Sequence, residues 1–533
     1  MAASGAPEDE VVDITSRLLD EEIDFPKDFE PGASKVPIIS SVDSSSDLEI
    51  SPDAEYEGSA TSTSGRPRSS INEIGRSTSL EADKDAGDTG VEASHTPYFE
   101  FSEDGEQVDN DNLEESFEDE DCNSEEWKRK KKHIFVLSEA GKPIYSRHGN
   151  EERLATLMGV MQALVSYVAV SGDQIRFVKA GEHRLAFLLR LPLILVAATT
   201  LPLSFQQLLS QLNYVHAQII SILSASQLAR AFEHRHNFDL RRLLAGSERF
   251  LDSLCDLMDE DPSFLMGAVR CLPLPSDIRE TITQTIAQFC SKVKNLVFAI
   301  LVAENHIVAL VGMKQYQLHH HDIHLIFNMV HASESFKSAE SWTPICLPKF
   351  DPSGFLHAHV SYLAENCPAC LLLLTIDRDM FFPLQECRRN ITDRLRKHHC
   401  LEAIGTSLKA GGYSVSEVGV PTLSHFVYKS RSTAQLTSPP MEAPYNTADE
   451  RERLLGFYHL LHHRMYQPEC PLKILYFATD REILLGWHMA GFELYASFEP
   501  LVTKETAVHA MTKLVQWIKK EENRLFIMSS VTL

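Results

Sequence analysis

The pattern of apolar and polar residues changes sharply at residue 128. Residues 1–127 contain few bulky apolar side chains, whereas regular apolar runs fill the rest of the chain. The run at 133–137 has the length and the β-branched and aromatic content of a buried strand. A turn at 139–143 then leads into a second short run, which predicts a hairpin. Residues 154–168 repeat apolar side chains with the 3.6-residue period of a helix, and Leu157, Met161 and Leu164 are expected on its inner face.

This order of elements continues and then recurs. Three strand-like runs, at 174–178, 184–189 and 193–198, follow the helix, and helical sequence returns at 208–223. Two strands, a helix, three strands and a helix are the order of a longin domain. The same cadence occurs three times, at spacings of roughly 130–160 residues, which predicts an internal structural repeat. The later elements are expected at 295–301, 307–312, 323–330, 342–347, 357–362, 369–376, 388–400, 424–429, 449–462, 473–478, 483–488, 492–498 and 508–518.

The predicted fold class is therefore α+β. We expect three longin-like domains, each a mostly antiparallel five-stranded sheet flanked by helices, after a disordered acidic N-terminal tail. A chain of 533 residues is too long for one core, which agrees with several folded units. The expected boundaries are 1–127 for the tail and 128–290, 291–408 and 409–533 for the three domains.

The negative charge of the chain is concentrated in the tail. Residues 1–127 hold 36 acidic and 7 basic residues, a net charge of −29, whereas the remainder holds 39 and 43, a net charge of +4. So polar a segment cannot bury enough apolar surface to offset chain entropy, which predicts disorder. Ser69 and Ser79 follow basic residues and are candidate phosphorylation sites, although a random serine-rich linker is the alternative. A nearly neutral folded part disfavours nucleic-acid binding.

Targeting signals are not evident. No uncharged apolar run of about 18 residues occurs, so no membrane-spanning helix is expected. The first ten residues have neither the basic start nor the apolar core of a secretory signal. We therefore expect a cytoplasmic protein whose ten cysteines are reduced thiols.

Candidates for chemistry are few. The chain lacks a P-loop, a dinucleotide-binding fingerprint, a G-x-S-x-G elbow and a kinase signature. His320 and His324 share a helical face but have no evident third metal ligand. Cys367 and Cys370 have C-x-x-C spacing, but a redox pair needs a helix after the first thiol, and here a strand is predicted. We expect no catalytic residue, metal or cofactor; a zinc- or thiol-dependent enzyme is the alternative.

Five consecutive cations, Lys128, Arg129, Lys130, Lys131 and Lys132, precede the first predicted strand. Such a run can attract anionic lipid by about 1 kcal/mol per cation near the surface. It can also hold the acidic tail, or serve nuclear import or nucleic-acid binding. We expect membrane or tail binding.

Several long motifs, in order along 128–533, resemble those of the Mon-one family of vacuolar and endosomal fusion proteins. They are the segments 131–146, 158–161, 239–249, 346–350 and 453–456. The resemblance implies a subunit of three longin domains that pairs with a second such protein, Ccz-one, and in animals with a third, larger subunit. It implies that the pair is a guanine-nucleotide exchange factor for the late-endosomal Rab GTPase, which promotes early-to-late endosome conversion, fusion with the vacuole or lysosome, and autophagy.

The resemblance also implies how the complex reaches membranes and acts. The early-endosomal Rab GTPase and phosphatidylinositol 3-phosphate would recruit it peripherally to endosomal membranes. Exchange needs no catalytic side chain, because the factor only has to bind the nucleotide-free GTPase better than the loaded one. The first longin domains of both subunits would form the GTPase platform. A longin-type trafficking adaptor without exchange activity is the alternative.

One contact with a GTPase can be proposed. The longin strand order predicts that the strand at 342–347 lies at a sheet edge, and Pro344 and Pro348 are typical protectors of such an edge. Trp342 could anchor a partner GTPase there. The alternative is that Trp342 packs under a helix of its own domain.

Overall fold

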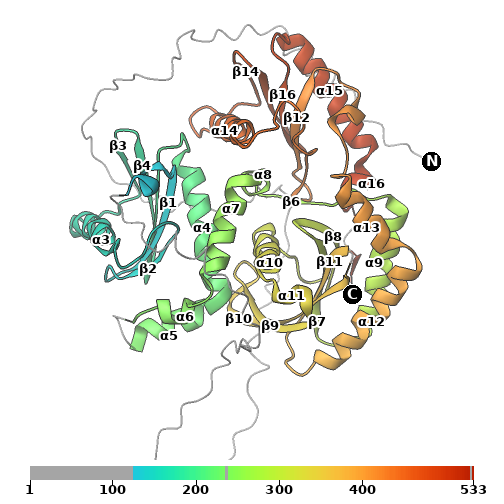
Figure 1. The fold of residues 1–533 in the computed structure, drawn as a ribbon, viewed down its shortest axis with the longest axis horizontal. Helices are drawn as coiled ribbons and strands as arrows, with labels where there is room; N and C mark the ends of the chain where they lie inside the picture. Colours follow the sequence, from blue (N-terminus) through green and yellow to red (C-terminus); the bar gives the residue numbers. More distant parts are fainter. Residues whose placement is uncertain (1–123, 235–237, 366, 529–530, 533) are drawn as a thin grey trace, which may run out of the picture. The chain divides into compact units, whose positions relative to one another are not determined.

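The computed structural model describes residues 124–234, 238–365, 367–528 and 531–532, which all belong to one compact unit. Three sheets with helices on their faces follow one another along the chain (Figure 1). The fold class of three longin domains is confirmed, since each sheet contains five antiparallel strands in one common order. Predictions for residues 1–123, including Ser69, Ser79 and nearly all of the acidic tail, lie outside the described residues.

The first sheet has the strand order β2-β1-β5-β4-β3, and all of its neighbouring strands are antiparallel. All seven residues of β1 are buried, because helices cover both faces of this central region. The elements are α2 (Glu125–Arg129), β1 (Lys132–Ser138), β2 (Pro143–Ser146), α3 (Ala155–Val170), β3 (Phe177–Ala180), β4 (His183–Arg190), β5 (Leu193–Thr199) and α4 (Phe205–Leu223).

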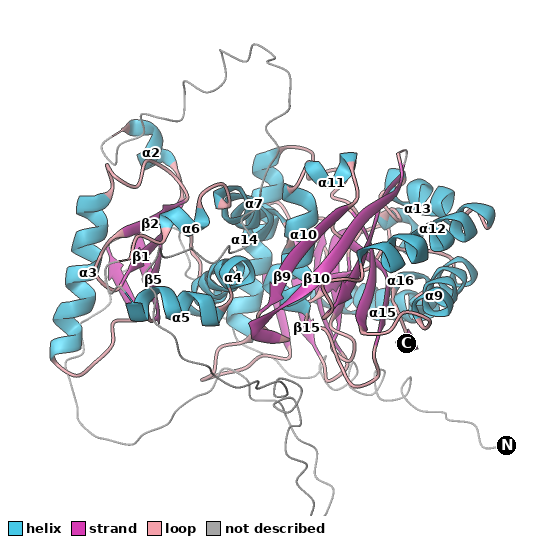
Figure 2. Ribbon diagram, turned by 90° about the horizontal axis from the view of Figure 1, so that it is seen from below, coloured by secondary structure: helices cyan, strands magenta, loops and turns pink. Residues whose placement is uncertain are grey.

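Different helices cover the two faces of the first sheet. Phe135 of β1 packs in one cluster with Met158 and Met161 of α3. Its neighbour Ile134 points to the opposite face and joins a cluster with Leu212 of α4, as alternation along a strand requires. Helix α3 thus lies on the side of the sheet away from α4 (Figures 1 and 2).

Helix α4 also connects the first domain to the second. It contacts β4 and β5 of the first sheet, and it contacts β9 (Ser341–Leu347), an outer strand of the second sheet. The linker after α4 is helical and packs around it, with α7 in contact with both α4 and α10 (His320–Ala332) (Figure 1). The linker elements are α5 (Ala225–His234), α6 (Arg241–Leu244), α7 (Glu248–Glu260), α8 (Pro262–Met266), β6 (Val269–Arg270) and α9 (Ser276–Cys290).

The second sheet repeats the strand order of the first, as β8-β7-β11-β10-β9, and β17 extends it in parallel beside β8. Helix α9 buries Ile282 and Ile286 in this second core, although it precedes the boundary predicted after residue 290. The boundary itself stays a prediction. The elements are β7 (Leu296–Ala303), β8 (His306–Gly312), α10 (His320–Ala332), α11 (Ser335–Ser338), β9, β10 (Asp351–Ala364), β11 (Cys367–Thr375), α12 (Phe381–Lys397), α13 (Cys400–Lys409) and β17 (Val531–Thr532).

The third sheet has the order β13-β12-β16-β15-β14, and the linker strand β6 extends it in parallel beside β13. Each of these two sheets is therefore extended by a strand from outside its own domain, the second by β17 and the third by β6. The elements are β12 (Leu423–Ser430), β13 (Gln435–Thr437), α14 (Ala448–Met465), β14 (Ile474–Ala478), β15 (Ile483–His488), β16 (Phe492–Phe498), α15 (Lys504–Lys520) and α16 (Glu522–Leu525).

The prediction of one helix over 388–400 is wrong. Helix α12 begins earlier, at Phe381, and ends at Lys397, and α13 starts at Cys400. His399 between them has a φ of 56°, a left-handed conformation that an α-helix cannot contain. Apolar residues recur on both sides of the break, at Leu395 and at Cys400, so the sequence pattern did not mark it.

Candidate functional site

The histidines near 320 serve packing. His319 caps the start of α10, because its imidazole accepts a hydrogen bond from the backbone N–H of His321 at 3.2 Å. Burial lowers the pKa of His320 to about 2 and that of His324 to about 4, so both rings are neutral at pH 7. The described residues contain no group of three or more His, Cys, Asp or Glu side chains placed to hold a metal ion.

The C-x-x-C pair lies inside strand β11, which begins at Cys367, two residues before the start of the predicted strand. Cys367 and Cys370 are both buried, and burial raises the pKa of Cys370 to about 12. A thiol in such surroundings stays protonated and is a poor nucleophile. The geometry therefore gives this pair no feature of a redox site.

The run of five cations divides into two parts. Lys128, Arg129 and Lys130 are exposed, the first two in the last turn of α2. Lys131 forms an ion pair with Glu452 of α14 at 2.6 Å, and Lys132 is 4% exposed and paired with Asp259 of α7. The last two cations thus join the first domain to the third domain and to the linker. Membrane or tail binding by the run stays a prediction that rests on the first three.

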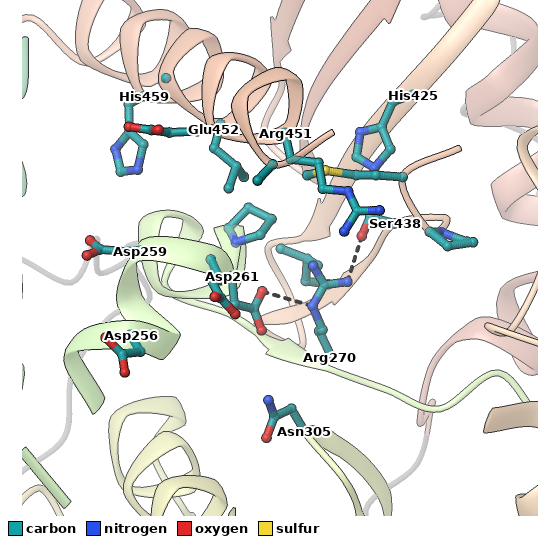
Figure 3. A pocket seen from close by; sticks show the side chains of 18 of the residues that line it. Asp256, Asp259, Asp261, Arg270, Asn305, His425, Ser438, Arg451, Glu452 and His459 are labelled. Carbon is teal, nitrogen blue, oxygen red and sulfur yellow. Dashed lines mark hydrogen bonds and ion pairs between the residues drawn. The ribbon is translucent and has the colours of Figure 1, made fainter. Parts of the chain in front are cut away.

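A cavity of about 1210 Å³ lies beside this junction (Figure 3). Arg270 pairs with Asp261 at 2.8 Å and donates a hydrogen bond to Ser438 Oγ at 2.6 Å. Burial alone would raise the pKa of Asp261, but the charge of Arg270 lowers it below its usual value. The charged residues of the described wall are Arg129, Lys130, Lys131, Lys132, Arg147, Arg270 and Arg451 against Asp256, Asp259, Glu260, Asp261, Glu304 and Glu452.

Most of these charges are already paired with one another. Arg147 binds Asp256 at 2.8 Å and Asp259 at 2.7 Å, and Gln207 of α4 donates to the carbonyl of His459 in α14 at 2.8 Å. A cleft concentrates a charged ligand when one sign of charge dominates its wall. This wall is nearly balanced, so its geometry favours a junction between domains over a site for an ionic ligand.

An exposed apolar surface lies on the first domain, on α3. The helix contains no charged residue over its 16 positions. Its buried side is held by Met158 and Met161, whereas Tyr167 is 81% and Val170 89% exposed on the other side. We define the α3 surface as Val160, Leu164, Tyr167 and Val170 of α3, all of which are exposed.

The α3 surface was not foreseen. Leu164 was expected on the inner face of the helix with Leu157 and Met161, but it is 40% exposed, so that expectation is wrong. The sequence signal that could have revealed the surface is the absence of charge from every face of the helix. Strand β3 beside it is a short outer strand that pairs with β4 and, among the described strands, with no other.

Trp342 lies on β9, an outer strand of the second sheet, as predicted. Its ring stacks on His357 at a centroid distance of 5.6 Å and meets the edge of Phe381, the first residue of α12, at 6.0 Å. Trp342 is thus half-buried and partly covered by a helix of its own domain. Nearby, Phe382 is 76% exposed. We call Trp342, His357, Phe381 and Phe382 the Trp342 surface.

Comparison with known proteins identifies the three domains. Profiles described as the first, second and third longin domain of FUZ, MON1 and HPS1 match residues 132–254, 294–393 and 422–522. These ranges contain every strand of the three sheets apart from the added strands β6 and β17.

Whole-chain relatives agree with the domain matches. Vacuolar fusion protein MON1 homolog A of chicken (Gallus gallus) is 49% identical over 78% of this chain and 75% of its own length. Protein SAND of Takifugu rubripes is 46% identical over 78% and 79%, and human MON1 homolog B is 43% identical over 76% and 77%. With close similarity over all three longin domains, this chain belongs to the MON1 family of vacuolar fusion proteins.

Proposed function

We propose that this chain is the non-catalytic longin subunit of a heteromeric guanine-nucleotide exchange factor. It pairs with Ccz-one, and in animals with a third, larger subunit, and the complex activates the late-endosomal Rab GTPase. The names of the relatives, which refer to vacuolar fusion, support a role in membrane trafficking. The exchange activity and the partner proteins are proposals that go beyond what these names state.

The observation that carries the proposal is the α3 surface. Water-exposed apolar groups such as Tyr167 and Val170, on a helix that has no charged side chain, mark a surface that another protein covers. Strand β3 at the adjacent sheet edge leaves backbone groups free for a partner strand. A second longin domain supplies both a helix and a sheet edge, so it can cover α3 and β3 together.

Nucleotide release follows from the difference between the factor's affinities for the two forms of the GTPase. A factor that binds the nucleotide-free GTPase more tightly than the loaded form shifts the GTPase towards nucleotide loss. The paired first domains form the surface that holds the GTPase switch in the nucleotide-free conformation. No acid, base or metal of this chain takes part, so activity depends on shape and on the integrity of the pair.

Two further surfaces of the chain are suited to recruiting the complex to endosomal membranes. The Trp342 surface presents aromatic side chains at a sheet edge, where a GTPase such as the early-endosomal Rab can dock. The exposed cations Lys128, Arg129 and Lys130 fit phosphatidylinositol 3-phosphate and other anionic lipids. Among the described helices, none combines the length and the apolar character that crossing a bilayer requires. Endosomal attachment is thus proposed to be peripheral.

The test is co-expression with Ccz-one followed by a nucleotide-release assay on a panel of Rab GTPases. We expect a stable complex that accelerates release of labelled GDP from the late-endosomal Rab and leaves unrelated Rabs unaffected. The chain alone should aggregate or remain inactive, because its α3 surface is uncovered. A stable complex that accelerates release from none of the Rabs would instead support the trafficking adaptor.

A further inference from the structure

Two buried thiols of the second domain lie against each other. Cys290 is the last residue of α9 and Cys387 lies in α12, and their sulfur atoms are 3.9 Å apart. The two helices are in direct contact and share one apolar core with β11. Disulfide formation requires the sulfurs to approach by about 2 Å, to a bond length of about 2.05 Å.

Four of the six other buried thiols among the described residues have an oxygen partner in place of a second sulfur. Each of the four donates to a carbonyl or amide oxygen at 2.9–3.7 Å, which keeps the sulfur protonated. No second pair of sulfurs within hydrogen-bonding distance occurs among the described residues. The donors of this kind are Cys271, Cys346, Cys367 and Cys400.

The surroundings distinguish the two thiols. Either sulfur can donate in this contact; when Cys290 donates, the hydrogen bond lowers the pKa of the Cys387 thiol and raises that of Cys290. Burial and the carboxylate of Glu386 act in the opposite direction on the pKa of Cys387, and the ammonium of Lys292, just beyond the end of α9, adds to the lowering. Cys387, which is 5% exposed, is slightly more accessible to a small oxidant than Cys290, which is 1% exposed.

We propose that Cys290 and Cys387 form a dithiol site that hydrogen peroxide oxidises to an intramolecular disulfide, with Cys387 as the attacking sulfur. The Cys387 thiolate forms an S–O bond with one peroxide oxygen, the O–O bond breaks, and the departing hydroxide takes a proton to leave as water. The sulfur of Cys290 then attacks the resulting sulfenic acid. The S–S bond forms, the S–O bond breaks, and a second water leaves.

The consequence is a covalent tie between α9 and α12. Helix α12 begins at Phe381, which packs against Trp342, so the oxidised state fixes the start of the helix that supports the Trp342 surface. The residues joined are 97 positions apart in sequence, so the tie restricts the unfolded chain strongly and raises the unfolding temperature. This site does not depend on the exchange function proposed above.

Peptide mapping after peroxide treatment tests the site in the full-length chain, purified with its partner subunit. Trypsin releases Cys290 in the peptide 280–292 and Cys387 in the peptide 379–388, and each peptide contains one cysteine. Without reduction, we expect these two peptides to appear as one cross-linked species that has lost two hydrogens. Its yield should rise with peroxide, and reduction with dithiothreitol should abolish it.

Cysteine variants test whether Cys290 and Cys387 are the two thiols that form the disulfide. Cys387→Ser should abolish the cross-link and the rise in unfolding temperature on oxidation, whereas Cys470→Ser, at an exposed thiol, should change neither. A wild-type chain whose Cys470 is fully oxidised while Cys290 and Cys387 remain alkylatable would overturn the proposal. So would a cross-link that joins either cysteine mainly to some other thiol. The wild-type measurement decides the matter even if a variant fails to fold.

Discussion

The hydroxyl of Tyr214, on α4 of the first domain, donates a hydrogen bond to Nδ1 of His324, on α10 of the second, over 2.9 Å. The opposite nitrogen of the ring, Nε2, donates to the carbonyl of Ala268 at 3.1 Å, which fixes the neutral tautomer. The ring of His321 stacks on Tyr214 at 3.9 Å. One buried tyrosine thereby connects two longin domains through a histidine that must stay uncharged.

Tyr214→Phe should destabilise the chain. The substitution preserves the ring but leaves Nδ1 of the buried His324 without a donor, which costs about 1–3 kcal/mol of unfolding free energy. Urea unfolding of the variant should show this loss. The matched control is Tyr167→Phe, which removes a hydroxyl from an 81% exposed ring and should leave stability unchanged. Equal stability of the two variants would show that the Tyr214 hydrogen bond contributes nothing.

Acidification should weaken the same junction. Burial lowers the pKa of His324 to about 4 and that of His321 to about 3; Asp261 partly offsets the effect at His324, and His319 reinforces it at both. Unfolded histidines accept protons near pH 6.5, so between pH 6.5 and 4 the unfolded chain binds more protons than the folded chain. The neutral histidines therefore contribute their full stabilisation above about pH 6.5, and the free energy of unfolding decreases as the pH falls below that value.

Urea unfolding at pH 7, 6 and 5 measures this effect. We expect His324 alone to contribute a loss of about 1–2 kcal/mol by pH 5. The loss should be smaller in His324→Gln, which cannot be protonated, even though that variant starts from lower stability. Unfolding free energy that stays constant or rises on acidification would contradict the role of the buried histidines.

Two adjacent lysines should differ in their effect on stability. Lys132→Met removes a buried ammonium from Asp259 and Gln211 and should cost about 1–3 kcal/mol, since Arg147 still compensates Asp259. Lys131→Met breaks an exposed pair with Glu452 and should cost less than about 1 kcal/mol. Chemical denaturation of both variants gives the comparison. The prediction fails if Lys131→Met is the more damaging substitution.

Opposite sides of α3 should respond differently to a carboxylate. Met161→Asp places an unpaired charge in the core of the first domain and should unfold it, so that no complex is recovered. Tyr167→Asp places the same charge on the α3 surface and should leave the isolated fold intact but prevent pairing with Ccz-one. Circular dichroism and co-purification separate the two effects. A Tyr167→Asp chain that pairs normally would remove α3 from the interface.

Long apolar runs made most of the fold predictable. Strand β1 at Lys132–Ser138 and helix α14 at Ala448–Met465 lie within a few residues of their expected positions, because each is a continuous pattern bounded by turn or capping residues. The two-residue strands β6 and β17 escaped prediction, since so short a segment has no periodicity. Only tertiary contact with β13 and β8 makes them strands.

The candidate surfaces were predictable only in part. The edge position of Trp342 followed from the repeated strand order, but its stacking on His357 depends on the register between β9 and β10. The run of five lysines and arginines looked uniform, yet Lys132 is buried because Asp259, 127 residues later, lies over it. Pairing between distant residues decides which charges stay exposed, and local sequence does not contain it.

The most direct test of the proposed function is the rate of labelled GDP release from the late-endosomal Rab in the presence of Ccz-one. Equal amounts of the wild-type chain and of Tyr167→Asp are added in parallel, with the Rab tethered to anionic vesicles. We predict rapid release with the wild-type chain and release at the intrinsic rate with the variant. The same rate with both chains, or no acceleration by the wild-type chain, would contradict the account.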